Sequence, residues 1–392
     1  MSDIVILAAT RTPLGAFQGE LAGIPAPLLG AAAIKGALSQ SGLTREAVTD
    51  VIMGCALQAG LGQAPARQAA LGAGLPPATR CVTVNKVCGS GLQAVIYGRW
   101  ELAAGDADVV IAGGMENMSA APYLLPHARQ GYRLGHRQVI DSMVHDGLWD
   151  PHLDRHMGQC AEACATKYGI TREQQDAYAI ESYRRAQSAQ EGGRFAWEIT
   201  PVETADPRGS ARRVERDEGP GRARFEKIPT LAPAFAKDGT ITAANASSLN
   251  DGAAALVLAR METAAAAGAR PLARIVSTGA HAAEPRWFTT APVQAAREAL
   301  GRAGWSPAEV ELWEVNEAFA VVPLAFAREL AVPHDRLNVN GGAIALGHPI
   351  GASGARIVVS LLGALRQRQL KRGVAAICIG GGEGLALCVE LF

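Results

Sequence analysis

Two stretches of this chain, DVVIAGGMEN (108–117) and AAICIGGGEG (375–384), share one pattern. Each is an apolar run that ends in glycines and a glutamate, Glu116 or Glu383, and each follows a Gly/Ser turn that opens a helix-like segment. Alternating helices and strands of this kind predict an α/β fold in which both halves of the chain follow one βαβ plan. A chance match of two short segments is the alternative to a duplication.

Further apolar runs alternate with helix-like segments, which indicates helices packed on mostly parallel strands. The runs are DIVILAA, VIMGCAL, ALVLA and VELWEVN, and one helix-like segment is LLGAAAIKGALSQSG. The 392 residues suffice for two or three domains. The 37 basic residues balance 37 acidic ones, which argues against a general nucleic-acid binder. The sequence lacks an apolar stretch of 18 residues, so we expect no membrane span.

The composition changes between residues 120 and 248, which carry many polar side chains and few strand-like runs. One clear helix is TREQQDAYAIESYRRAQSAQEGG, with Thr171 as its N-cap. A polar loop with six arginines follows, beginning at Arg208. We expect this middle part to be an insertion over an α/β body.

The cysteines are scattered, at positions 55, 81, 88, 160, 164, 378 and 388. This odd, dispersed set does not look like a disulfide framework and favours a reducing cytoplasm. Cys88 follows CVTVNKV, which we expect to be a strand that ends at this cysteine, and it precedes a glycine-rich turn and a helix. The N-terminus of that helix would stabilise a thiolate, which makes Cys88 a candidate nucleophile. A small buried hydrophobic residue is the alternative.

His348 stands in NGGAIALGHPIGASG (340–354), whose glycines predict a mobile loop before a helix. An imidazole there suits a base that meets a nucleophile, or else a helix cap. Cys378 lies at the end of an apolar run, where it either fills the core or belongs to a site. The glycines that follow, which include Gly380, offer backbone N–H groups for an oxyanion hole. In WEVNEAFA, Asn316 and Glu317 follow an expected strand and open an expected helix. Either residue could be the N-cap of that helix. Alternatively, Asn316 holds a water against a substrate oxygen.

The motifs resemble those of the thiolases in order and spacing, over the whole chain. They are VNKVCGSGLQA, NEAFA, NGGAIALGHPIGASGARI, CIGGGEG, HMGQCAE, AGLGQAPARQAA and NASSLNDGAA. The short-chain, tetrameric members are most similar, which implies a reversible Claisen condensation of two acetyl-CoA molecules to acetoacetyl-CoA and CoA. It also implies that Cys88 takes the acyl group, His348 removes the thiol proton and Cys378 removes the α-proton of the second substrate. His348 and a water on Asn316 would stabilise the enolate, and the N–H groups of Cys88 and Gly380 the tetrahedral intermediate.

The resemblance further implies the architecture: two similar α/β halves in five layers, αβαβα, with an inserted loop domain. The expected boundaries are 1–120 plus 249–270 for the N-terminal half, 121–248 for the loop domain and 271–392 for the C-terminal half. The segment PHARQGYRLGHRQVI (126–140) resembles the one that joins dimers into tetramers, so we expect a homotetramer. CoA is implied as part of substrate and product, without a metal or a tightly bound cofactor.

The pantetheine slot of the family maps onto eight residues of this chain. They are Leu148, His156, Met157, Phe235, Ala243, Ser247, Ala318 and Phe319. The loop 208–224 would meet the nucleotide phosphates, and Arg222 stands in for an arginine that the family often has nearer to the preceding Asp-Glu pair. Phe288 takes a position where many short-chain members carry methionine.

A zinc site is a competing reading of HLDRHMGQCAEAC, in which His152, His156, Cys160 and Cys164 recur every four residues. On one straight helix this set spans ~18 Å, too far for four ligands around one ion. We therefore expect a helix face beneath the CoA site.

Three further functions compete with the main one. A 3-ketoacyl-CoA thiolase for longer chains is a near alternative, although WEVNEAFA and GGAIALGHPIGASGARI resemble the acetoacetyl type slightly more. A decarboxylating condensing enzyme on an acyl carrier protein shares the fold but lacks a cysteine at the Cys378 position. A non-catalytic scaffold would carry damaged catalytic positions, whereas Cys88, His348, Cys378 and Asn316 are all present.

Overall fold

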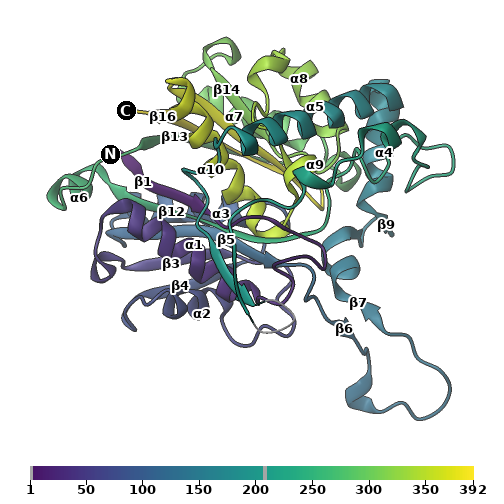
Figure 1. Cartoon of the computed structure of the whole chain (residues 1–392), viewed down its shortest axis with the longest axis horizontal. Coiled ribbons are helices and arrows are strands. Elements are labelled where there is room, and N and C mark those ends of the chain that lie inside the picture. The colour runs from purple at the N-terminus through teal and green to yellow at the C-terminus, as the bar shows by residue number, and fades with distance from the viewer. Residues whose placement is uncertain (1–2, 206–209) are drawn as a thin grey trace.

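The computed structural model describes residues 3–205 and 210–392, and a sheet of ten strands runs through the centre of this part of the chain (Figure 1). The strand order is β14-β15-β16-β13-β1-β12-β5-β3-β4, with β2 beside β12. The strands are β1 (Ile4–Arg11), β2 (Gly15–Ala16), β3 (Asp50–Gly54), β4 (Arg80–Val84), β5 (Val109–Asn117), β12 (Asn250–Arg260), β13 (Ala273–Ala282), β14 (Leu312–Val315), β15 (Arg372–Ile379) and β16 (Glu383–Leu391). β12, predicted from ALVLA, returns from the middle of the chain to lie between β1 and β5.

The prediction of mostly parallel strands is wrong. Over the described residues, three strand pairs of this sheet are parallel and six are antiparallel. β3 pairs in parallel with β4 and β5, and β14 with β15. β15 and β16 are joined through Gly380–Gly382 alone, and so short a connection joins only antiparallel neighbours.

Helices cover both outer faces of the sheet and fill the space between its two halves, which gives the five layers that the resemblance implies (Figure 1). α1 and α2 pack outside the N-terminal strands, α7 packs outside β13 and β16, and α3 and α10 lie in the middle layer. The helices of these layers and their connections are α1 (Ala26–Ser41), α2 (Pro65–Gly72), α3 (Ser90–Ala104), α6 (Met261–Ala266), α7 (Ala291–Ala303), α8 (Val321–Leu330), α9 (Ala343–Leu346) and α10 (Ile350–Arg368).

β1 shows why the strands read as unbroken apolar runs. Val5 and Leu7 pack in the outer core with α1, whereas Ile4 and Ile6 pack in the inner core with α3 and α10. Because both faces are buried, the strand is apolar at each position from Ile4 to Ala9, and Thr10 and Arg11 follow at its end.

The two helices of the middle layer meet at glycines. A Cβ atom on Gly91 of α3 would lie 2.7 Å from the backbone nitrogen of Ala355, and one on Gly354 of α10 would lie 2.4 Å from the backbone nitrogen of Leu92. A larger residue at either position would force the helices apart. This contact places the two helix N-termini together, and Cys88 and His348 directly precede them.

The elements of the middle part of the chain are β6 (Tyr123–Leu124), β7 (Ile140–Asp141), β8 (Trp149–Asp150), β9 (Arg155–His156), α4 (Met157–Tyr168), α5 (Arg172–Glu191), β10 (Val202–Ala205) and β11 (Ala211–Val214). The helices α4 and α5 lie beside the C-terminal half, whereas β10 and β11 pack against the N-terminal half (Figure 1). Thr171 caps α5 as predicted, since its hydroxyl oxygen accepts from the N–H of Gln174. The predicted arginine-rich loop is in part strand β11, paired with β10, and Arg208 lies outside the described residues.

Short helical turns complete the connections. They are Arg45–Ala47, Ala128–Gln130, the π-helical turn Met143–Leu148, Pro220–Arg222, Phe225–Thr230, Pro285–Trp287, Pro307–Glu309 and His334–Arg336. Among residues 3–205 and 210–392, every helix is too short or too polar to cross a membrane.

The glycine contact between α3 and α10 predicts a selective loss of stability. We expect Gly354→Ala to lower the free energy of unfolding by at least about 1–3 kcal/mol, because backbone atoms of the other helix cannot move aside. Thermal unfolding would measure this. The control is Gly301→Ala in α7, where among the described residues nothing lies within 4 Å of the added carbon, and a gain of up to about 1 kcal/mol is expected. Equal melting temperatures for the two variants would contradict the prediction.

Candidate active site

A cavity of about 380 Å³, within the size range of small-molecule sites, lies where the middle part of the chain meets the start of α10. Three of the predicted catalytic residues line it, namely Cys88, His348 and Gly380. They come from the two halves of the chain, so the fold itself assembles the site.

Cys88 lies in a sharp turn between β4 and α3. β4 ends at Val84, so the predicted strand up to Cys88 is too long. Val87 has a φ angle of 45°, which is rare for a β-branched residue. The hydroxyl of Ser90 holds the turn, because it accepts from the N–H of Lys86 at 2.8 Å and donates to the carbonyl of Val87 at 2.6 Å. Backbone strain of this kind, held by its surroundings, is typical of functional sites.

The sulfur of Cys88 rests as a thiol. Burial raises the pKa of Cys88 to about 11, and the N–H groups of Gly380 and of Cys88 itself, which donate to the sulfur, only partly oppose this rise. These N–H groups lower the pKa, so they favour the thiolate that a base would generate. The same two N–H groups are those predicted for the oxyanion hole, and the nucleophile needs a base.

The hydrogen bonds of His348 leave one ring nitrogen free to accept a proton. Its Nδ1 lies 2.5 Å from Oγ of Ser353, and this hydroxyl donates its proton to the carbonyl of Pro349 at 2.9 Å. Because the hydroxyl proton is already used, Nδ1 must donate, and the lone pair is on Nε2. Nε2 is buried and finds no hydrogen-bond partner in the described part of the chain. Burial, and next the charge of Arg356, lower the pKa of His348 to about 3, so the imidazole is neutral at physiological pH.

The stretch 340–354 is buried throughout, so the prediction of a mobile loop is wrong. Its glycines allow close packing instead. A Cβ atom on Gly347 would lie 2.2 Å from the side chain of Asn250, and the φ angle there is 115°. The N–H of His348 donates to the carbonyl of Ser248 and to Oδ1 of Asn250, both at 3.2 Å. The backbone of His348 is thus held by the close contact of Gly347 with Asn250 and by the hydrogen bonds of its own N–H.

Cys378 is fully buried near the end of β15, two residues before Gly380. Burial raises the pKa of its thiol well above the ordinary value, and the charge of a Cys88 thiolate raises it further. The two sulfurs are therefore within electrostatic reach of each other. Cys378 is not among the described residues that line the cavity, unlike Cys88 and Gly380.

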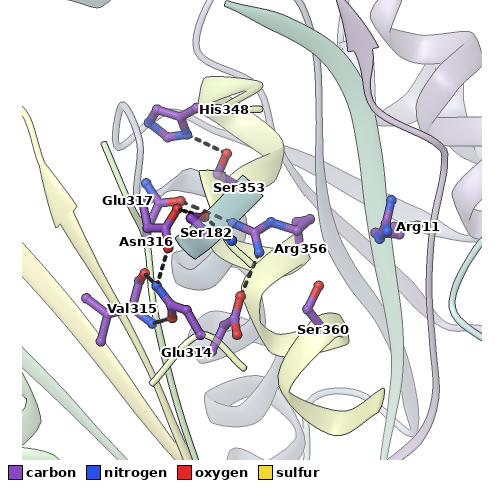
Figure 2. Close-up of polar contacts among 12 residues, drawn as sticks. Arg11, Ser182, Glu314, Val315, Asn316, Glu317, His348, Ser353, Arg356 and Ser360 are labelled. Atoms are coloured by element: carbon purple, nitrogen blue, oxygen red, sulfur yellow. Dashed lines mark hydrogen bonds and ion pairs between the residues drawn. The ribbon is translucent and has the colours of Figure 1, made fainter. Parts of the chain in front are cut away.

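Asn316 follows β14 as predicted, but α8 begins only at Val321, so neither Asn316 nor Glu317 caps that helix. Its N–H donates to the carbonyl of Ala376 at 2.9 Å, and its Oδ1 accepts from Arg356 at 3.4 Å (Figure 2). Its Nδ2 is buried and, over residues 3–205 and 210–392, unpartnered. A free amide donor at this place is suited to hold a water, although Asn316 is not among the described residues that line the cavity.

All eight residues expected in the pantetheine slot line the cavity, and so does Phe288. They are Leu148, His156, Met157, Phe235, Ala243, Ser247, Ala318 and Phe319. The ring of His156 stacks on Phe235 at 4.7 Å, and Phe319 meets both Phe235 and Phe288 edge to face. Arg222 is not part of the described lining; its exposed guanidinium pairs with Glu218 at 3.1 Å, and its contact with a nucleotide stays a prediction.

The helix expected to carry His152 through Cys164 is shorter, because α4 begins at Met157. His156 is its N-cap and accepts from the N–H of Gly158 at 3.1 Å, while Cys160 and Cys164 are buried in a core cluster with α7 and α8. This part of the chain therefore forms one wall of the cavity, as expected of a helix face beneath it.

Sequence reasoning missed several residues of the site. The additional lining residues are Met118, Gly147, Ala234, Ala246, Ser248, Leu249 and Ile350. Ser248 and Leu249 lie in NASSLNDG, which was noticed only for Ser247. Ser353 contacts His348, and Arg356 contacts Asn316. The short spacing between His348 and Ser353 was an available signal, whereas nothing local connects Arg356 with Asn316.

The comparisons with known proteins agree with this geometry. Residues 4–262 match the family described as "Thiolase, N-terminal domain", and residues 269–391 match "Thiolase, C-terminal domain". An acetyl-CoA acetyltransferase of Pseudomonas aeruginosa is 54% identical over 388 residues, covering 99% of each chain. One of Cupriavidus necator is 50% identical over 391 residues, covering 100% of each. The chain therefore belongs to the thiolase family.

Solved structures show the same fold. The Acat5 thiolase of Ascaris suum, crystallised in complex with coenzyme A, superposes with a TM-score of 0.94 at 44% identity and full coverage of both chains. The acetyl-CoA acetyltransferase of Bacillus anthracis gives a TM-score of 0.97 at 40% identity, covering 100% of this chain and 99% of the other.

The raised pKa of Cys88 predicts a steep pH dependence of alkylation. We expect the rate of modification by iodoacetamide to rise continuously between about pH 7 and pH 9.5, because a thiol with a pKa near 11 is about one part in 10⁴ thiolate at pH 7. Mass spectrometry of the peptide that contains Cys88 measures the rate. A plateau at or below about pH 8.5, the ordinary thiol pKa, would contradict it.

Proposed function

We propose that this chain is an acetyl-CoA C-acetyltransferase, which joins two acetyl-CoA molecules into acetoacetyl-CoA and CoA and also catalyses the reverse cleavage. The observation that carries this proposal is the cavity shared by the Cys88 thiol, the lone pair of His348 and the N–H of Gly380. The full-length relatives named acetyl-CoA acetyltransferase support the two-carbon acyl group. They do not favour a longer-chain thiolase or a scaffold.

The first half-reaction acylates the enzyme. The thiol proton of Cys88 moves to Nε2 of His348, and the sulfur attacks the carbonyl carbon of acetyl-CoA. The N–H groups of Cys88 and Gly380 hold the oxyanion, and each is worth about 3–4 kcal/mol. The bond between that carbon and the CoA sulfur then breaks, and the CoA sulfur takes the proton of Cys378. An acetyl thioester remains on Cys88, with His348 protonated and Cys378 a thiolate.

The second half-reaction forms the carbon–carbon bond. The Cys378 thiolate removes an α-proton from a second acetyl-CoA, and the enolate oxygen is held by Nε2–H of His348 and by a water on Nδ2 of Asn316. The enolate carbon attacks the acetyl carbon on Cys88. The bond to the Cys88 sulfur breaks, and this sulfur regains its proton from His348. Every group thus returns to its starting state, and acetoacetyl-CoA is released.

The proposal extends to the binding of CoA. The pantetheine arm would run along the aromatic side chains of His156, Phe235 and Phe319, with Ser247 as a hydrogen-bond partner of an amide. Arg222 would meet the nucleotide end. CoA acts here as part of substrate and product, and the reaction needs no tightly bound cofactor or metal because CoA already activates both acyl groups.

We also propose a cytoplasmic homotetramer built from three regions per chain: 1–120 plus 249–270, 121–248, and 271–392. The segment from β6 to β7 extends away from the body (Figure 1). It exposes Leu134, which is 86% accessible, together with Leu125, Tyr132 and Val139. Apolar side chains gathered on such a projection support a contact between copies.

Acylation tests the proposed function. Incubation with acetyl-CoA is expected to add one acetyl group to Cys88, detected by mass spectrometry of its peptide. Cys88→Ala is expected to lose this adduct and to lower the rate of acetoacetyl-CoA cleavage at least about 10⁴-fold. The matched control is Cys388→Ala, at a buried cysteine outside the described lining of the cavity, which is expected to keep the adduct. Turnover by Cys88→Ala at the original rate would overturn the proposal.

Association tests the tetramer. Leu134→Asp is expected to reduce the particle from four chains to two, because a charge would be buried without a partner at the contact. Light scattering after gel filtration measures the mass. The control is Leu28→Asp on α1, an exposed leucine away from this segment, which is expected to stay tetrameric. A tetramer that survives Leu134→Asp at all concentrations would count against a contact through this segment.

A further inference from the structure

A charged side chain is buried in the middle layer behind the proposed active site. Arg356 of α10 is fully buried, and its Nη1 donates to Oε1 of Glu314 at 2.8 Å. Its Nη2 lies 3.4 Å from Oδ1 of Asn316 (Figure 2). One guanidinium therefore contacts both the end of β14 and the residue that follows this strand.

The contact decides which way the amide of Asn316 is turned. A guanidinium has only donors, so the atom of Asn316 that faces Arg356 must be the oxygen. Nδ2 is then directed away from Arg356, and within the described residues it is left without a partner. If the amide turned over, two donors would face each other in a buried place, which is costly.

Stability alone does not account for the pair. The side chains of Arg356 and Glu314 are 1% and 4% accessible, and burying two charges costs about as much as their attraction returns. Apolar residues of similar volume often serve stability equally well. What an apolar pair does not supply is a donor that fixes the amide of Asn316.

The backbone around Asn316 is held independently of Arg356. The N–H of Asn316 donates to the carbonyl of Ala376, in the neighbouring strand. The next residue, Glu317, accepts from Tyr178 and Ser182 at 2.8 Å and from Asn338 at 2.9 Å. Removal of Arg356 would thus free the amide group while these bonds keep the chain in place.

We propose that Arg356 is a positioning residue for carbon–carbon bond formation and cleavage, because it holds the amide of Asn316 with Nδ2 presented to the enolate oxygen through a water. This inference rests on the proposed function, in which the enolate step uses Asn316 and the acylation step does not. The positive charge of Arg356 also opposes protonation of His348, so the same side chain helps to keep the base neutral in the resting enzyme.

Two reactions of the same enzyme separate positioning from folding. Exchange of labelled CoA into acetyl-CoA requires only acylation of Cys88. Cleavage of acetoacetyl-CoA also requires the enolate. The ratio of the two rates does not depend on the fraction of folded enzyme, so a variant that is merely less stable keeps the ratio.

The main variant is Arg356→Met combined with Glu314→Leu, which removes both charges and leaves no unpaired ion. We expect its cleavage rate to fall about 10- to 100-fold relative to exchange, since misplacing one donor costs less than deleting it. Asn316→Ala deletes the donor completely and serves as the reference. Its cleavage rate is expected to fall about 10²- to 10³-fold relative to exchange. Glu314→Gln, which keeps an acceptor for Arg356 and leaves the guanidinium facing Asn316, is expected to retain the original ratio.

Arg11→Lys is the matched control for damage to a buried arginine. Arg11 is fully buried and paired with Glu198 and Asp217, and it lies apart from Asn316 in Figure 2. This variant is expected to melt at a lower temperature with an unchanged ratio.

The outcomes are distinguishable. If the wild-type enzyme exchanges no CoA, the proposed function fails. If it does, and Asn316→Ala lowers the ratio while the double variant does not, the role of Arg356 is wrong. If Asn316→Ala leaves the ratio unchanged, the inference also falls, because the amide then has no part in the enolate step.

Discussion

The site depends on one close approach, between Gly91 of α3 and Gly354 of α10. The two helices touch through backbone atoms there, and their N-termini bring a cysteine from one half of the chain next to a histidine from the other. The surrounding core is shared, because strands of both halves pack their inner faces on these helices. A shift of the crossing by the width of a methyl group would move both reacting residues at once, since each directly precedes its helix.

Desolvation determines the protonation states in the site as strongly as direct contacts between residues do. The imidazole of His348 is neutral because it is buried, and desolvation of the half-buried Cys88 raises the pKa of its thiol. The resting site therefore contains a weak nucleophile and an unused base rather than an ion pair. In the proposed reaction, acyl transfer would create charge only when a substrate is present, and the N–H groups of Cys88 and Gly380 would stabilise it. An empty site of this kind is protected from side reactions of a free thiolate.

Most of the fold and the residues of the site could be predicted from short motifs. The glycine-flanked cysteine and histidine, the strand before Gly380 and the cap at Thr171 all lie where local patterns placed them. The direction of β12 and β13 could not be predicted, because their antiparallel partners β1, β5 and β16 are distant in sequence. The antiparallel pairing of β15 with β16 was open to prediction, since only Gly380–Gly382 connect the two strands. The glycines around His348 looked like signs of mobility, yet Gly347 packs against Asn250, about a hundred residues earlier. Arg356 was missed for a similar reason, because nothing local in GASGARI reveals that its guanidinium meets Asn316.

The shared inner core has a consequence for the chain as a whole. Helix α3 belongs to one half and α10 to the other, and each covers apolar surface that its own half would otherwise expose to water. Neither half is thus a self-sufficient unit, although the two are built alike. Cutting the chain between β12 and β13 would yield two fragments that each expose this apolar surface and that cover it again when they associate.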